Sequence, residues 1–439
     1  MPRVGLLFAH DFDREGTQNQ PGLLFDRAGF DLFSFPSQLG LAWFNLDRFV
    51  RAQVERGRRL RWHGVFSAQE QYGALAAALV ARELGLPGTD PRAIVAAQHK
   101  AYARRVLQQV APEANLDFDV LQAEPDQPLT SQDLSGLRYP LYLKPVKAAF
   151  SILAKRIDTP EQLRAHLAFS RWEKYLLRRL IDPFESARTR LLPEAGSAYR
   201  MLIETPVPLS VPQYNLDGFM QEGQAHAIGV VDALMYPGTQ AFMRWDLPSR
   251  LPQQVQQRAL SIASRFLQAI GFSHGLFNLE FFHDPITDRI TIIECNPRMA
   301  SQFSDLYRRV LGLDLHALAL HLALGQPWTS LRRQAISARV ASSLVYRSFP
   351  GEATPRAPNA RQLSELRQEI PDALVFSMPK DATGQARDYK WTGSHRYGLV
   401  HLGASDWGAL NALALRASRL LGWPDRVALG SSANTDCAT

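Results

Sequence analysis

The chain has 439 residues, of which 46% are hydrophobic, 21% charged and 10% aromatic, as in an ordinary folded globular protein. Its net charge of +7 would suit a phosphate-bearing ligand, but basic residues do not interleave with aromatic ones, so no nucleic-acid partner is expected. No apolar run reaches the roughly 20 residues that span a bilayer, and Cys295 and Cys437 are too few for a disulfide framework or a metal cluster. We therefore expect a cytoplasmic protein of two to four domains without a membrane partner.

The first hundred residues alternate predicted strands with predicted helices. Residues 3–9 and 59–67 have the composition of buried strands, and an Ala- and Leu-rich helix over 68–84 follows the second strand and ends before Gly85. A further helix is predicted from His99 to about residue 110. Strands that alternate with helices predict a parallel α/β sheet.

The middle of the chain changes texture. Residues 111–137 are polar and Pro-rich and are predicted to form a linker, and 139–146 form a strand that Pro145 halts. A helix follows from residue 160, with Thr159 as its N-cap. From about residue 199 the pattern is that of antiparallel strands, with turns at Gly223 and over 284–288 and a helix over 253–270. From about residue 335, further strands and a final helix over 407–422 are predicted.

One strand end carries three polar side chains with alternating spacing. The segment ITIIECNPRMA, residues 290–300, begins as an apolar run and ends in Glu294, Asn296 and Arg298. Side chains at every second position share one face of a strand, if the strand continues past Pro297. Acid and amide oxygens suit a hard cation such as Mg²⁺, and an arginine can stabilise charge on phosphoryl oxygens. The alternative from spacing alone is three exposed polar residues.

A second carboxylate belongs to the same arrangement. Glu280 lies on a predicted strand that a short turn joins to the strand of Glu294, so a hairpin can bring the two side chains together. Facing carboxylates repel each other unless a cation lies between them. Cys295 lies between two candidate ligands and is expected to point to the opposite face, into the core.

The segment 274–300 resembles the metal-binding end of the ATP-grasp superfamily. The resemblance implies that Glu280, Glu294 and Asn296 are ligands of one or two Mg²⁺ ions, for which Mn²⁺ could substitute, on the phosphates of ATP. It implies that Arg298 is the catalytic residue that contacts the transferred phosphoryl group or the acyl phosphate.

Other segments follow the order of the same superfamily from Gly64 to Trp328. Lys100 and Lys144 match the two nucleotide lysines, Ser151 matches a small polar residue of the phosphate-covering loop, and Glu204 matches an acid beside the adenine. An arginine one helical turn after Lys100, at position 104 or 105, could share its task.

The chain departs from the superfamily in that loop. It is usually glycine-rich, since bare backbone N–H groups approach phosphates, yet residues 146–155 contain no glycine. Three explanations stay open. The loop covers ATP with small residues and gains charge from Lys147 or Lys155, or it closes only when a particular substrate binds. In the third, the protein has lost turnover and only binds the nucleotide.

The resemblance also implies the fold and its domains. The fold class is α/β with α+β lobes, namely an ATP-grasp fold preceded by a Rossmann-like domain and followed by a small α+β domain. The expected domains are 1–95, 96–334 and 335–439, and the central one divides into subdomains of about 96–200 and 205–334.

The implied activity is an ATP-dependent carboxylate–amine ligation through an acyl phosphate, with release of ADP and phosphate. The partners would be small-molecule carboxylates and amines, and a homodimer contact is left open. Weaker candidates for substrate binding are Arg244, His274 and the N-terminal loop with His10 and Asp11. Two alternatives are a nucleotide-binding pseudoenzyme or regulator and, within the class, a carboxylating enzyme like biotin carboxylase.

Overall fold

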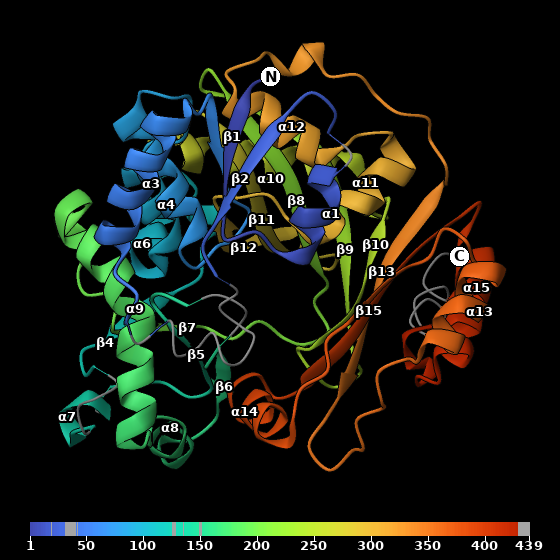
Figure 1. The fold of residues 1–439 in the computed structure, drawn as a ribbon. Coiled ribbons are helices and arrows are strands. Elements are labelled where there is room, and N and C mark those ends of the chain that lie inside the picture. The colour runs from blue at the N-terminus through green and yellow to red at the C-terminus, as the bar shows by residue number, and fades with distance from the viewer. Residues whose placement is uncertain are drawn as a thin grey trace.

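The computed structural model describes residues 1–18, 20–30, 41, 43–124, 129–134, 136–148 and 152–428. The described strands form three sheets, and the mixed α/β architecture predicted from the sequence is confirmed. Figure 1 shows the N-terminal elements at the upper left and upper centre, the four-stranded sheet at the lower left, and most of the C-terminal strands and helices on the right.

The N-terminal sheet has three strands in the order β2–β1–β3, and they are parallel, as predicted; β2 itself was not predicted. Its elements are β1 (Arg3–Leu7), α1 (Asp11–Gln18), β2 (Leu24–Ala28), α3 (Leu46–Leu60), β3 (Gly64–Phe66) and α4 (Gly73–Leu84). The strand predicted over 59–67 is too long, because α3 continues to Leu60 and ends only where Arg61 adopts a left-handed conformation. The helix predicted from residue 68 begins at Gly73, so Glu70 lies in the loop before it.

Two helices lead from this sheet into the next part of the chain, α5 (Pro91–Gln98) and α6 (Lys100–Val110). The predicted helix from His99 is confirmed as α6, and the His99 side chain accepts a hydrogen bond from the backbone N–H of Tyr102. The sequence prediction misses α5, although Asp90 caps it and Pro91 opens it.

The four-stranded sheet is antiparallel, in the order β4–β7–β5–β6. The elements of this region are β4 (Phe118–Leu121), α7 (Ser131–Leu134), β5 (Leu141–Pro145), β6 (Lys155–Ile157), α8 (Pro160–His166), α9 (Arg171–Leu191) and β7 (Met201–Glu204). The segment predicted as a linker therefore contributes a strand and a short helix. Thr159 caps α8 as predicted, but α9 was not predicted, even though Ser170 and Glu173 form a capping box at its start.

The largest sheet has eight antiparallel strands in the order β12–β11–β8–β9–β10–β13–β15–β14. Their bounds are β8 (Gln213–Gln221), β9 (Gln224–Met235), β10 (Phe242–Leu247), β11 (Gly275–Asp284), β12 (Arg289–Asn296), β13 (Val340–Ser348), β14 (Leu374–Ser377) and β15 (His395–Ala404). The predicted turns at Gly223 and over 284–288 are confirmed. Strands from both sides of the expected boundary at residue 335 share this sheet, and the division into domains stays a prediction.

Helices cover both faces of the large sheet. They are α10 (Gln253–Ala269), α11 (Ser304–Leu311), α12 (Leu315–Ala323), α13 (Ala360–Glu369), α14 (Ala382–Thr392) and α15 (Trp407–Leu421). One core cluster packs α10 with α5, α6 and α9 against the strand end that carries Cys295, which is buried as predicted. A second packs α11 and α12 between β1 and the large sheet, and a third holds α13 and α15 on the C-terminal strands (Figure 1). In the described part of the chain, no helix is both long and apolar enough to cross a membrane.

Candidate active site

The β11–β12 hairpin places the two predicted glutamates side by side. Glu280 lies opposite Glu294, and Asn278 lies opposite Asn296, in neighbouring antiparallel strands. The amide nitrogen of Asn296 donates to Oε1 of Glu280 at 3.1 Å, and Gln213 on β8 donates to Oε2 at the same distance. The predicted hairpin contact is confirmed, and it forms because a short turn fixes the register of adjacent strands.

Arg298 lies just beyond the end of β12, because the strand stops at Asn296 and does not continue past Pro297. Its guanidinium donates to Oε2 of Glu70 at 2.7 Å. Glu70 comes from the loop between β3 and α4, so the N-terminal sheet supplies a residue to this cluster. Sequence reasoning missed Glu70 because the segment was assigned to a continuous helix.

Lys100 joins the hairpin from the other side, at the first position of α6. Its ammonium lies 3.1 Å from Oε2 of Glu294 and donates to the backbone carbonyl of Ala148 at 2.7 Å. Because the side chains of Lys100 and Glu294 are 12% and 24% exposed, both groups can reach a ligand and still interact through a medium less polar than water.

Lys144 belongs to a buried ion triad. Its ammonium lies 2.9 Å from Oε2 of Glu204, whose Oε1 accepts from Nε of Arg104 at 2.6 Å. Arg104 also donates to the backbone carbonyl of Ile292 at 2.8 Å, which ties α6 to β12. Both oxygens of Glu204 are therefore occupied by cations, and the predicted contact with an adenine stays a prediction.

Burial and neighbouring charges set the protonation of the two facing glutamates. Burial and then the charge of Glu294 raise the pKa of Glu280 to about 8. Burial acts in the same direction on Glu294, but the charges of Lys100 and Lys144 outweigh it and hold the pKa of that carboxyl below its ordinary value. One carboxylate and one protonated carboxyl therefore face each other when no cation is present.

This donor set fits a magnesium ion. Two carboxyl groups and an amide oxygen are ligands that Mg²⁺ takes, usually shared with phosphates. The amide nitrogen of Asn296 is engaged by Glu280 and Asn278, which leaves the amide oxygen as its ligand atom. Among the described residues, no three His, Cys, Asp or Glu side chains gather as a metal cluster. An ion here would therefore need Asn296 and ligand oxygens in addition to the two glutamates.

The structure does not bring every predicted residue to this cluster. Arg244 is fully buried, and its guanidinium donates to Asp246 at 2.7 Å and to Ser342 at 3.0 Å. These contacts connect neighbouring strands of the large sheet, so Arg244 has a structural role. Nε2 of His274 lies 2.9 Å from the carbonyl oxygen of Leu322 on α12. Neither residue contacts the cluster. Ser151 lies outside the described residues.

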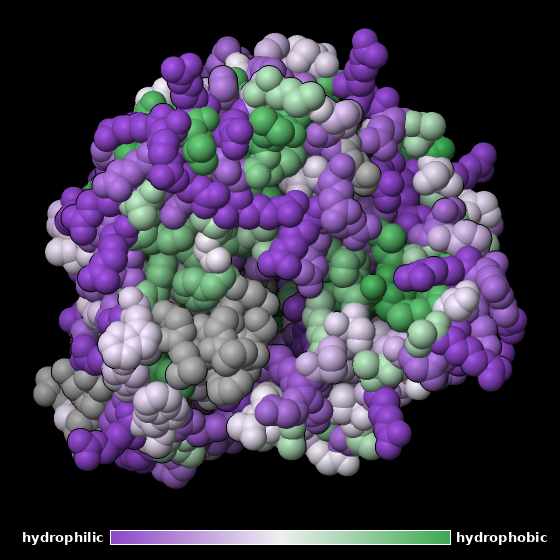
Figure 2. Space-filling model, in the orientation of Figure 1, coloured by the Kyte–Doolittle hydropathy of each residue, from purple (hydrophilic) through white to green (hydrophobic). Residues whose placement is uncertain are grey.

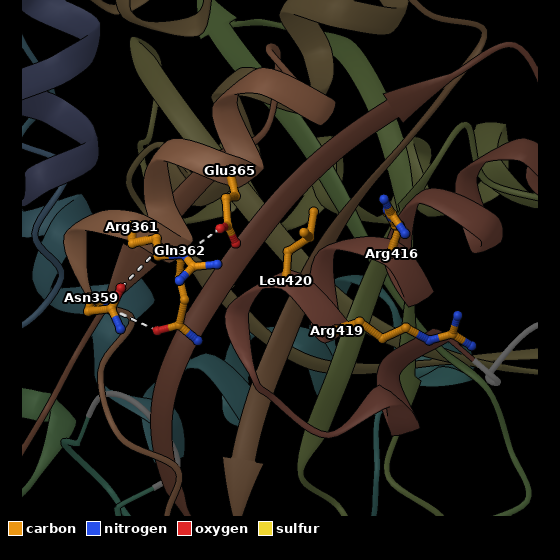
Figure 3. A pocket seen from close by; sticks show the side chains of 7 residues that line it. All are labelled: Asn359, Arg361, Gln362, Glu365, Arg416, Arg419 and Leu420. Atoms are coloured by element: carbon orange, nitrogen blue, oxygen red, sulfur yellow. Dashed lines mark hydrogen bonds and ion pairs between the residues drawn. The ribbon is translucent and has the colours of Figure 1, made fainter.

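The surface of the protein has two features besides the cluster. Figure 2 shows the face seen in Figure 1, where hydrophilic side chains alternate with hydrophobic patches left of the centre and on the right, and a recess lies near the centre. A pocket on the C-terminal helices, shown in Figure 3, is lined by residues of α13 and α15, including Arg361, Arg416 and Arg419. Of these, Arg361 pairs with Glu365 and Arg416 pairs with Glu369. This pocket shares no residue with the cluster and is not assigned a role.

The comparisons with known proteins agree with this geometry. A protein-family model described as "Carbamoyl-phosphate synthase L chain, ATP binding domain" matches residues 245–331, which include the β11–β12 hairpin and Arg298. The chain is similar in fold to an L-amino acid ligase from Bacillus licheniformis, with a TM-score of 0.65 and 15% identity over 96% of this chain and 97% of that one. The chain therefore has the ATP-grasp fold that the sequence resemblance implied.

Two curated relatives are similar in sequence. Carnosine synthase 1 from Gallus gallus is 37% identical over 108 residues, which are 24% of this chain and 11% of that protein. Protein y4rH from Sinorhizobium fredii (strain NBRC 101917 / NGR234) is 24% identical over 304 residues, which are 69% of this chain and 57% of that protein. The matched part of the chain thus spans about a tenth of the length of carnosine synthase 1 and somewhat over half of the length of protein y4rH.

Proposed function

We propose that this protein is an ATP-dependent ligase that joins a small carboxylate to an amine and releases ADP and phosphate. The observation that carries the proposal is the pair of facing carboxyl groups, Glu280 and Glu294, with Lys100, Lys144 and Arg298 beside them. The relatives support a ligation on amino-acid substrates through their names alone, since one is a carnosine synthase and one an L-amino acid ligase.

Each residue of the cluster has a task in binding MgATP. Lys100 and Lys144 neutralise charge on the polyphosphate, because a fixed ammonium is a compact cation. Glu280, Glu294 and Asn296 would hold Mg²⁺, which would draw charge from the phosphate oxygens when bound. Arg104 holds Glu204 in place between itself and Lys144 and so keeps the Lys144 ammonium at the strand end.

The proposed reaction has two steps. A substrate carboxylate oxygen attacks the γ-phosphorus of ATP, the bond from that phosphorus to the β–γ bridging oxygen breaks, and ADP leaves. The amine nitrogen then attacks the carbonyl carbon of the acyl phosphate, loses a proton, and phosphate leaves as the amide forms. Arg298 stabilises the charge on the phosphoryl oxygens, and positioning and charge neutralisation supply most of the rate.

The glycine-free loop favours the pseudoenzyme as the competing function, because backbone N–H groups of a glycine-rich loop normally approach the phosphates. A complete set of acidic, amide and basic residues in contact with one another weighs against that function. A carboxylating reaction would instead require bicarbonate as the carboxylate substrate, and the same assay can include it.

The test is ADP and phosphate release with MgATP, in the presence of the twenty amino acids singly and in pairs, followed by mass spectrometry of the products. Glu294→Gln should abolish ADP formation, whereas Glu365→Gln, which removes an exposed carboxylate on α13, should leave it unchanged. An amide product that depends on Glu294 supports the proposal. Bound MgATP with no ADP under any substrate mixture, bicarbonate included, would favour the pseudoenzyme.

A further inference from the structure

Lys147 is a buried basic residue without a role in the reaction proposed above. Its side chain is about as buried as any in the protein, with 1% of the residue exposed. Its ammonium nitrogen has no hydrogen-bond partner among the described residues. The ammonium lies 4.9 Å from the ring centre of Phe184 on α9, and a ring face attracts a cation but satisfies none of its three donors.

The backbone around Lys147 is fixed to the nucleotide lysine of α6. The carbonyl of Val146 accepts from the backbone N–H of Lys100 at 3.1 Å. The carbonyl of Ala148 accepts from the Lys100 ammonium at 2.7 Å. Lys147 is therefore held between two residues that both bind Lys100, at the entry to the glycine-free loop.

The acids near Lys147 already have partners. Glu70 is paired with Arg298, and Glu294 is paired with Lys100. The site as a whole has five basic side chains (Lys100, Arg104, Lys144, Lys147 and Arg298) and four acidic ones (Glu70, Glu204, Glu280 and Glu294). Lys147 is the member of the five for which the described residues provide no carboxylate.

An unpaired ammonium in such a place is costly. Burial lowers the pKa of Lys147 to about 7, and the charges of Glu70 and Glu294, which act in the opposite direction, do not offset it. A methionine or leucine could fill the same space beside Phe184 without the cost of burying a polar group. Packing alone therefore does not explain a lysine here, and a bound anion would supply the missing acceptor.

We propose that Lys147 binds the β- and γ-phosphates of the nucleotide and replaces the backbone N–H groups of the missing glycines. The inference rests on the proposed function, since it takes the cluster as a MgATP site. Charge-assisted hydrogen bonds to phosphate are stronger than neutral ones, so one ammonium could offset several lost backbone contacts.

The test compares the binding of ATP and AMP by calorimetry in the full-length protein. Lys147→Met should weaken ATP about 10- to 100-fold, the range for loss of one charge-assisted hydrogen bond, and should leave AMP within about twofold of wild type. The matched control is Lys390→Met on α14, whose side chain is 55% exposed and pairs with Glu173, and it should leave both affinities unchanged. Equal ATP affinity in wild type and Lys147→Met would overturn the inference.

A second measurement uses the wild-type protein and does not depend on the folding of a variant. The titration of the lysine ammonium groups, followed by NMR with ¹³C-labelled lysine, should move to higher pH for Lys147 with ATP than with AMP, because a phosphate oxygen favours the charged form. The exposed Lys390 should titrate equally with both nucleotides. The same titration of Lys147 with both nucleotides would also overturn the inference. If the ligation assay yields no amide while Lys147 still discriminates ATP from AMP, the proposed reaction fails and the phosphate-binding role stands.

Discussion

Replacing Glu204 by glutamine tests the buried ion triad that joins α6, β5 and β7. The side chains of Glu204, Arg104 and Lys144 are 3%, 2% and 6% exposed. The substitution keeps the size of the side chain but leaves two buried cations next to each other without their carboxylate. Removing one partner of a buried ion pair costs about 3–5 kcal/mol, because the remaining charge is left unpaired.

That free energy translates into a measurable melting shift. An unfolding entropy of about 2.1 cal/mol/K per residue over 439 residues amounts to roughly 0.9 kcal/mol/K, if the chain unfolds as one unit. A loss of about 4 kcal/mol would then lower Tm by about 4 °C. Smaller cooperative units would give a larger shift, since the same free energy is divided by a smaller entropy.

The assay is differential scanning calorimetry of the ligand-free protein at neutral pH. The matched control is Glu113→Gln, which removes the partner of Arg265 on the surface, where the two side chains are 57% and 42% exposed. An exposed ion pair contributes about 0–1 kcal/mol, so the control should melt within about 1 °C of wild type. The reasoning about the triad is refuted if Glu204→Gln melts as close to wild type as the control does.

Three further substitutions test the site and the core. Glu280→Gln should abolish the Mg²⁺-dependent rise in Tm with ATP, and thermal shift with and without Mg²⁺ measures it. The metal-free variant should be at least as stable as wild type at neutral pH, because the amide, unlike Glu280, does not have to take up a proton on folding. Arg298→Lys should lower kcat for ADP formation about 100-fold with ATP affinity within threefold, because lysine lacks the planar fork, and unchanged kcat would contradict the role. His401, whose pKa burial lowers to about 4, is protonated more readily in the unfolded chain, so stability present above pH 6.5 is lost as pH falls toward 4. Between pH 7 and pH 4, the free energy of unfolding from denaturant titrations should fall by about 3 kcal/mol less in His401→Leu than in wild type. An equal fall in both proteins would contradict the assignment.

The sequence predicted well those contacts that depend on near neighbours. Thr159 caps α8 and Gly223 lies in the β8–β9 turn, as their local patterns indicate. Two helices that the sequence prediction missed, α5 and α9, also have local signals, because clear capping residues mark the start of each. Pro183 in the interior of α9 works against a helix prediction there, although the tertiary packing of its apolar face maintains the helix.

The Glu280–Glu294 contact is the part of the site that the sequence by itself determined. Side chains alternate with a period of two along a strand, and the short turn after Asp284 leaves few possible registers. The identity of the two side chains then limits the chemistry, because facing carboxyl groups either share a cation or keep one of the two protonated. No distant part of the chain is needed for this step.

Only the tertiary structure decided which charges surround that pair. Glu70 and Arg298 are 228 residues apart, and Arg104 and Glu204 are 100 apart. Each of these contacts depends on how separate sheets and helices pack, and local periodicity carries no information about that packing. The burial of Lys147 without a partner is likewise a property of the folded arrangement, because a lysine in a polar loop segment is ordinarily expected at the surface.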